Sequence, residues 1–149
     1  MKNISKITFA YLLFTIVNCS GTRPDFLGVK EARLYPCPKA DNCVGSFEKK
    51  EDKEHFVDPI LYGIDKTKAY EELLALLKGK PNVQVVDQKP DYIYAEFTSK
   101  LMRYVDDVEF YFPASKQVEV RSASRIGSND WGVNRKRIES IRSELGWKK

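Results

Sequence analysis

Apolar residues recur at helical spacing in the middle of the chain, over residues 65–78. Four of them fall at positions i, i+3, i+4 and i+7, on one side of a helix: Tyr70, Leu73, Leu74 and Leu77. Asp65 suits the N-cap position, and Gly79 followed by Pro81 stops a helix. The pattern predicts an amphipathic helix between Asp65 and Lys78.

Four segments after this helix alternate apolar and polar residues with the period of two that is typical of β-strands. Their apolar positions are Val83 and Val85, then Ile93, Ala95 and Phe97, then Val108, Phe110 and Phe112, and finally Val118 and Val120. The turn sequences at 89–91 and 113–115 are short, and short connections favour antiparallel neighbours. We therefore expect an antiparallel sheet with one apolar face.

A second helix is predicted over residues 133–145, where Ile138, Ile141 and Leu145 contribute an apolar side. The apolar stripes of two helices can cover the apolar face of one sheet. The expected fold class is therefore α+β, a two-layer domain in which an antiparallel sheet of about four strands packs against two helices.

The first part of the chain has the pattern of an export signal. Lys2 and Lys6 precede an apolar run from Ile7 to Val17, broken only by two threonines. At eleven residues this run is too short to cross a hydrocarbon core of about 30 Å as a helix, but it has the length of a signal-peptide h-region. We expect residues 1–18 to be a cleaved signal peptide.

The apolar run ends in Ile16-Val17-Asn18-Cys19-Ser20-Gly21, which resembles a loose bacterial lipobox. The resemblance implies a diacylglyceryl group on the sulfur of Cys19, cleavage before this residue and acylation of the new amino terminus. Asn18 stands where such sites usually have Gly or Ala. The expected location is the extracytoplasmic face of a bacterial membrane, with the membrane bound through the lipid at Cys19.

These signals divide the chain into a signal peptide over 1–18, a lipidated cysteine and tether over 19–33, and a single globular domain over 34–149. The polar start of the tether, Ser20 to Asp25, is expected to hold the domain off the lipid surface. Removal of Lys2 and Lys6 with the leader reduces the 25 basic residues to 23, against 21 acidic ones. A net charge of +2 does not favour nucleic-acid binding, so no nucleic-acid partner is expected.

Three cysteines are an odd number, which needs an explanation in an exported protein. If Cys19 carries lipid, Cys37 and Cys43 remain as a pair in an oxidising compartment, and the turn-forming residues between them could bring the sulfurs together. A zinc site that adds His55 to these two cysteines is the alternative, but zinc-binding cysteines are usually closer in sequence and a fourth ligand is not evident. We favour a disulfide between Cys37 and Cys43, and we expect no metal or other cofactor.

Several motifs follow one another along the chain: Pro36-Cys37-Pro38, Asp41-Asn42-Cys43-Val44, His55, Asp106-Asp107, Arg-Ser-Ala-Ser-Arg from Arg121 and Asn-Arg-Lys-Arg from Asn134. Together they resemble the bacterial and plastid family called domain of unknown function 1499, over about Leu34 to Leu145. The chain departs from this family at residues 39–41, where Ser or Pro is usual, and at residues 44–46, where Val-Ser-Ser is usual. The resemblance implies no known activity, since the family is defined by sequence alone.

The segment 121–137 concentrates arginines where a predicted strand ends, a Gly-containing loop follows and the last helix begins. Guanidinium groups and the N–H groups of a helix N-terminus suit a carboxylate or phosphate, so the segment is a candidate anion-binding site. The alternative, which we favour, is a structural network in which the arginines pair with aspartates and hold the loop to the sheet. The candidate residues for either role are Asp106, Asp107, Arg121, Arg125, Asp130, Asn134 and Arg135.

The chain offers few groups for catalysis. His55 is its single histidine, and a hydrolase-like site would have to combine it with Asp106 or Asp107. These aspartates are adjacent, and on a regular strand they face opposite sides and cannot act as a carboxylate pair. The expected function is a membrane-anchored binding or interaction domain of the cell envelope, with a small anion or an envelope protein as its partner. A hydrolase-like enzyme remains the alternative, and no catalytic residue is assigned.

Overall fold

The structure, a computed structural model, describes residues 20–147. The predicted signal peptide over 1–18 and the candidate lipidated residue Cys19 therefore lie outside the described residues. Within the described part of the chain, no helix is both long enough and apolar enough to cross a membrane.

Both predicted helices are confirmed: α1 spans Lys66–Lys78 and α2 spans Val133–Leu145. The carboxylate of Asp65, the N-cap of α1, accepts hydrogen bonds from the backbone N–H groups of Thr67 and Lys68. These contacts satisfy donors that the first turn of a helix leaves unpaired. The N-cap that the sequence predicts is therefore the one that the structure contains.

The main sheet has six strands: β3 (Cys43–Gly45), β4 (Ile60–Leu61), β5 (Val83–Lys89), β6 (Tyr92–Thr98), β7 (Val105–Tyr111) and β8 (Gln117–Ser124). Five of them follow the order β3-β8-β7-β6-β5, and β4 pairs with another part of β8. A separate hairpin joins β1 (Val29–Lys30) and β2 (Arg33–Leu34). All of these pairings are antiparallel, as predicted for the four strands β5 to β8.

The expectation of about four strands is too low, and the reason is the length of the added strands. The four predicted strands are present as β5 to β8, whereas β3 has three residues and β4 has two. Such short segments show no recognisable alternation in sequence. They take their conformation from β8, whose outer edge pairs with β3 near Arg121 and with β4 near Val118.

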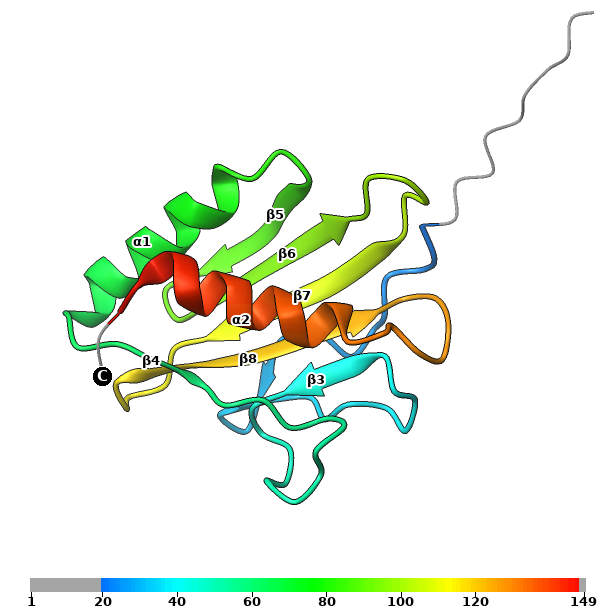
Figure 1. Ribbon diagram of the computed structural model, residues 1–149. Coiled ribbons are helices and arrows are strands. Elements are labelled where there is room, and N and C mark those ends of the chain that lie inside the picture. The colour runs from blue at the N-terminus through cyan, green and yellow to red at the C-terminus, as the bar shows by residue number, and fades with distance from the viewer. Residues whose placement is uncertain (1–19, 148–149) are drawn as a thin grey trace, which may run out of the picture.

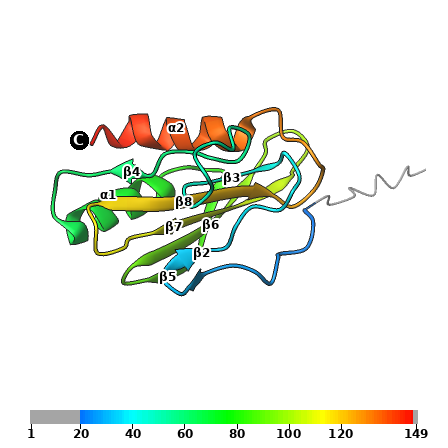
Figure 2. The ribbon, with the colours of Figure 1, turned by 90° about the horizontal axis from the view of Figure 1, so that it is seen from below.

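Both helices lie on one face of the sheet, and the hydrophobic core fills the space between the two layers (Figures 1 and 2). The core contains the apolar side chains that the alternation predicted, among them Ile93, Ala95, Phe97, Val108, Phe110, Val118 and Val120. α1 contributes Leu73 and Leu77, and α2 contributes Ile138 and Ile141. The two-layer α+β arrangement is therefore as expected.

The opposite face of the sheet is also covered, by the N-terminal part of the described chain. Figure 2 shows the segment that we call the N-terminal arm, residues 20–36, running beneath the sheet on the side away from α2. As a result, the polar positions of the strands are buried: Tyr92, Tyr94, Asp107, Glu109, Glu119 and Arg121. The arm includes most of the predicted tether, and it contacts the sheet directly through the side chains of Arg23 and Phe26 and the backbone N–H of Gly28.

Two loops meet at one end of the sheet, which we call the loop end. They are the β6–β7 loop (99–104) and the β8–α2 loop (125–132), and the described chain also begins here, at Ser20 (Figure 1). The β7–β8 turn and the C-terminus of the described chain lie at the other end. Loops and arm are therefore brought together by the lengths and directions of the central strands.

Candidate functional site

Arg121 and Glu109 form an ion pair in the middle of the arm-covered face. They stand directly opposite each other on β8 and β7, and their side chains are 1% and 0% exposed. Arg121 Nη1 donates to Glu109 Oε2 at 3.2 Å, and the hydroxyl of Tyr92 donates to Oε1 at 2.8 Å. The arm completes the pair, because the backbone N–H of Gly28 donates to Oε1 at 2.6 Å. Burial nevertheless raises the pKa of Glu109 above its usual value.

Arg125, which follows β8, binds two carboxylates on the same face. Its Nε and Nη2 donate to the two oxygens of Asp107 at 2.9 and 2.6 Å, and Nη2 also donates to Glu96 at 2.5 Å. Arg23 from the arm binds the same oxygen of Glu96 at 2.5 Å. The hydrogen bond to Asp107 is the main cause that raises the pKa of Arg125. Burial alone would raise the pKa of Glu96, but its bonds to Arg125, Arg23 and Tyr94 lower it below its usual value.

Asp106 points to the other face of the sheet, toward α2, as the strand alternation predicts. Its partner is Arg137, which also donates to the hydroxyl of Ser122 and to the side-chain oxygen of Asn134. The buried Asn134 in turn donates to the backbone carbonyl of Asn42 at 2.9 Å, in the disulfide loop. One polar network thus ties β7, β8, α2 and the disulfide loop together.

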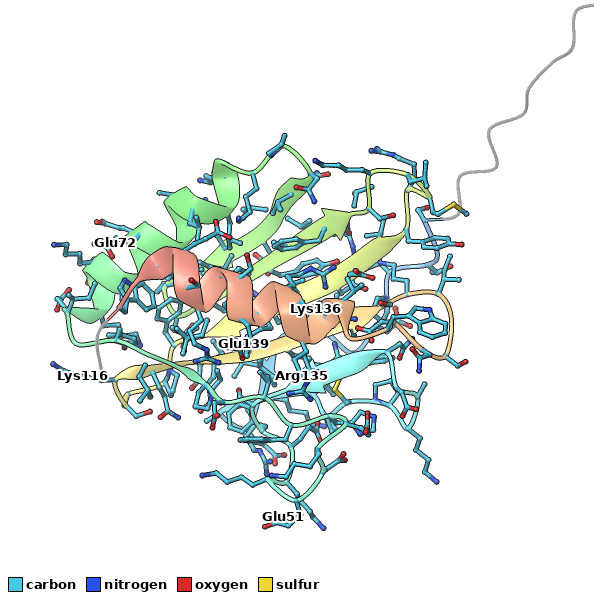
Figure 3. All side chains as sticks on the ribbon, viewed as in Figure 1. Glu51, Glu72, Lys116, Arg135, Lys136 and Glu139 are labelled. Carbon is cyan, nitrogen blue, oxygen red and sulfur yellow. A yellow bond between two sulfur atoms is a disulfide. The ribbon has the colours of Figure 1, made fainter. Side chains whose placement is uncertain are left out.

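The two remaining candidates hold loops rather than pair with each other. Asp130 accepts hydrogen bonds from the backbone N–H groups of Gly132 and Asn134, at 2.9 and 2.7 Å, and so fixes the start of α2. Arg135 donates to the backbone carbonyls of Phe56, Lys53 and Glu54. Figure 3 shows Arg135 on the side of α2 that faces the loop carrying Glu51.

His55 does not meet the aspartates that the hydrolase-like alternative requires. Its Nδ1 lies 2.9 Å from the carboxylate of Asp52, and its Nε2 lies 3.3 Å from the backbone carbonyl of Ala40. Burial lowers the pKa of His55, but these two partners outweigh it and the pKa is raised. Within residues 20–147, no hydrogen bond joins His55 to Asp106 or Asp107, and both aspartates are bound by arginines.

The predicted disulfide is present: the sulfurs of Cys37 and Cys43 are bonded, with Cα atoms 5.6 Å apart. Cys43 lies on β3, and the backbone N–H of Cys37 donates to Glu48 at 2.7 Å, so the loop is fixed at both sides. Both sulfurs are used by the bridge, and the zinc site with His55 is therefore not formed. In the described part of the chain, no group of three or more His, Cys, Asp or Glu side chains could hold a metal ion.

We expect replacement of both cysteines, Cys37→Ser with Cys43→Ser, to lower the free energy of unfolding by roughly 2 kcal/mol. The effect is modest because the bridge closes a small ring and restricts little of the unfolded chain. Denaturant unfolding of the variant beside the parent protein measures it. Reduction of the parent by dithiothreitol should produce the same loss, and an unchanged midpoint in both experiments would contradict a structural bridge.

A cavity of about 230 Å³ lies between the arm, the disulfide loop and the end of β8. Its lining includes Phe26, Asn42, Asp107, Arg121 and Arg125. The ring of Phe26 covers the guanidinium of Arg121, with 5.4 Å between the ring centroid and Cζ. Two buried atoms here, Arg121 Nε and Asn42 Oδ1, have no hydrogen-bond partner among residues 20–147.

The charges around this cavity are balanced. Three arginines of the arm-covered face contact three carboxylates: Arg23, Arg121 and Arg125 against Glu96, Asp107 and Glu109. An external anion would have to displace an internal carboxylate from the bonded N–H groups of these arginines, whereas Arg121 Nε has no partner among residues 20–147. The geometry therefore favours the structural network over an anion-binding site.

The sequence reasoning missed several members of the network, and some could have been found. Glu96 and Glu109 occupy the same face of the sheet as Arg121, so the pairing of Glu109 with Arg121 follows from the alternation once the strand order is known. Arg23 and Gly28 were assigned to a tether, and no motif marks them as partners of the sheet. Arg137 stands in the Asn-Arg-Lys-Arg motif, but only the helix phase shows that it, and not Arg135, reaches Asp106.

The comparisons with known proteins agree with the motifs. A family model described as "Protein of unknown function (DUF1499)" matches residues 33–145, which include the disulfide loop, the whole main sheet and both helices. A search among curated proteins finds no match. Since the family model covers most of the chain, this protein belongs to the DUF1499 family.

Proposed function

We propose that this protein is a lipid-anchored domain of the bacterial cell envelope that acts by interaction rather than by catalysis. The leader and the lipobox-like sequence support the anchor, because a short apolar run after two lysines ends at Cys19. The lipid attached to Cys19 would hold the domain on the extracytoplasmic face of the membrane. Family membership adds no activity to this proposal.

The observation that carries the proposal is the disulfide between Cys37 and Cys43. Structural disulfides persist in oxidising compartments and are rare in the cytosol. Since Cys37 and Cys43 are bonded to each other, Cys19 is the one cysteine of the sequence outside the bridge. Export and lipidation together account for all three cysteines.

An interaction role is supported by the state of the polar side chains. The histidine and the aspartates that a hydrolase-like site would need are bound to different partners. Arg121 and Arg125 are bound to internal carboxylates, and Arg135 is bound to backbone carbonyls. These residues stabilise the fold, so the partner of the domain is to be sought on its surface.

Cys19→Ser is expected to abolish incorporation of a fatty acid into the protein and to move it out of the detergent phase on partitioning. The reason is that the acyl chains supply the membrane affinity, at about 0.8 kcal/mol per buried methylene. Metabolic labelling of the parent and the variant in a bacterial host measures the change. Ser20→Ala, which keeps the cysteine, is the matched control and should be labelled like the parent. An unlabelled parent protein would refute the lipid anchor.

A further inference from the structure

The loop end carries most of the exposed large apolar side chains of the described domain. Of the eight large apolar side chains exposed within residues 20–147, five lie in its two loops, Leu101, Met102, Tyr104, Ile126 and Trp131, and a sixth, Val133, begins α2 directly after them. Leu101 is 88% exposed and Trp131 is 85% exposed, so neither has a packing partner of any size. The other two, Phe26 and Val29, belong to the arm. Apolar residues concentrated at one end of a domain indicate an interaction surface.

The backbone holds these side chains outward. Trp131 has a φ of 57° and Arg103 a φ of 59°, in the left-handed region that bulky residues rarely adopt. The side chain of Asn129 fixes the Trp131 turn by accepting its backbone N–H at 2.7 Å. The β6–β7 loop is closed by a backbone hydrogen bond from Ser99 to the carbonyl of Tyr104 at 2.8 Å. A strained tryptophan that is held in water, without contributing to the core, suggests a functional reason for its position.

The anchor leaves the domain at the same end. A Cβ added to Gly21 would lie 2.7 Å from Arg125 Cβ and 3.0 Å from Ile126 Cγ1, so the arm packs closely against the β8–α2 loop. The salt bridge from Arg23 to Glu96 fixes the next turn of the arm on the sheet. Cys19 is bonded to Ser20, and one residue spans only about 3.8 Å between Cα atoms. A lipid on Cys19 therefore enters the membrane beside this surface.

We propose that the loop end docks into the interface of the lipid bilayer that holds the anchor, a proposal that rests on the lipid anchor proposed above. Trp131 and Leu101 lie at the boundary of headgroups and acyl chains, where tryptophan is favoured. Lys100 and Arg103, which flank the apolar pair in the β6–β7 loop, are exposed and reach the lipid phosphates. The domain is then held against the membrane in one orientation, with the β7–β8 turn and the C-terminal end of α2 directed away from the bilayer.

The two tryptophans of the chain make a matched pair of reporters. Trp131 is at the loop end, whereas Trp147 packs on Tyr62, which bonds to the β7–β8 turn at the other end. Trp147→Phe leaves Trp131 as the only tryptophan, and Trp131→Phe leaves Trp147. Both full-length lipidated variants are reconstituted into phosphatidylcholine–phosphatidylglycerol vesicles, with and without bromine atoms on the acyl chains.

In the vesicles, we expect the emission maximum of Trp131 at a shorter wavelength than in the denatured protein without detergent. In the brominated vesicles, most of the Trp131 emission should be lost, because the bromine atoms quench it. Trp147 emission should be the same in both kinds of vesicle. Adding Leu101→Glu to the Trp147→Phe protein should restore much of the Trp131 emission, since a carboxylate opposes insertion. Leu101 has no packing partner in the domain, so this substitution leaves the fold intact.

A lipidated protein whose Trp131 is not quenched overturns docking and leaves the lipid anchor standing; that result is expected if the loop end binds an envelope protein or a second copy instead. Equal quenching of Trp131 and Trp147 overturns the proposed orientation. A protein without a fatty-acid label overturns the anchor and docking together, and the label reports this independently of fluorescence.

Discussion

Arg121→Met is expected to lower the free energy of unfolding by about 3–5 kcal/mol, the range found when one partner of a buried ion pair is removed. Methionine is unbranched and has nearly the volume of arginine without its charge, so the cavity left behind is small. The loss comes chiefly from Glu109, which is fully buried and would face no cation. Urea unfolding of the variant beside the parent protein measures the difference.

A double variant separates this cause from lost packing. Glu109→Gln removes the buried charge but keeps an oxygen that accepts from the hydroxyl of Tyr92 and the backbone N–H of Gly28. Combined with Arg121→Met, it should recover most of the stability that Arg121→Met alone removes. If the double variant is no more stable than the single one, the unpaired charge is not the cause.

The same pair has a defined pH dependence. Burial raises the pKa of Glu109 in the folded protein, and loss of Arg121 raises it further because the opposing attraction disappears. An acid with a raised pKa in the folded state binds more protons there than when unfolded, so its contribution to stability falls as the pH rises from its unfolded to its folded pKa. The deficit of Arg121→Met should therefore be smallest in mildly acidic buffer and largest at neutral pH. A deficit independent of pH would contradict the assignment to Glu109.

Arg125→Ala is the second substitution with a large expected effect, again about 3–5 kcal/mol. It removes the cation that binds the buried carboxylate of Asp107 and that shares Glu96 with Arg23. Arg135→Ala should cost less, about 1 kcal/mol, because the backbone carbonyls of its loop can turn to water. Thermal unfolding of both variants beside the parent protein compares them.

The contrast between these two arginines tests the role of the segment 121–137. Lower stability for Arg125→Ala, with a smaller loss for Arg135→Ala, agrees with a structural network. If Arg125→Ala leaves the melting temperature unchanged and instead abolishes binding of phosphate or a carboxylate by the full chain, the segment is an anion-binding site and the charge balance around the cavity has been misjudged.

Most of the helix-covered face could be predicted from the sequence. Apolar residues are periodic over the lengths of α1, α2 and the strands β5 to β8. The periodicity of each element predicts which of its faces is buried. The opposed directions of Asp106 and Asp107 also follow from the period of two. The partners of these two aspartates cannot be predicted in this way, because pairing depends on which strands are neighbours.

The arm-covered face shows where sequence reasoning fails. Alternation marks Tyr94, Asp107 and Glu109 as polar positions, which are usually exposed on a sheet with one solvated face. They are buried because residues 20–36 cross over them. The sequence of this segment has no helical or strand periodicity of apolar residues that would predict a packed segment. The strand face carries acids, tyrosines and an arginine together, and that mixture is the one signal that could have suggested a cover.

The exposed apolar surface at the loop end could not be predicted from the sequence either. In sequence, Leu101 and Met102 are two apolar residues in a polar loop, and Trp131 is a single aromatic residue near glycines. Only the directions of the strands bring the two loops to the end where Ser20 begins the described chain (Figure 1). The packing of the arm places the start of the described chain beside these loops, so it also determines where an anchor at Cys19 would enter the membrane.

The intact mass of the full-length chain, expressed in a bacterial host and purified from its membrane fraction, is the most direct test of the lipid anchor. We predict a chain that begins at Cys19, carries a diacylglyceryl group and an amide-linked acyl chain, and lacks the thiol hydrogens of Cys37 and Cys43. A chain that begins at Met1, without lipid and with its cysteines reduced, would contradict the envelope location, the anchor and the docking of the loop end together.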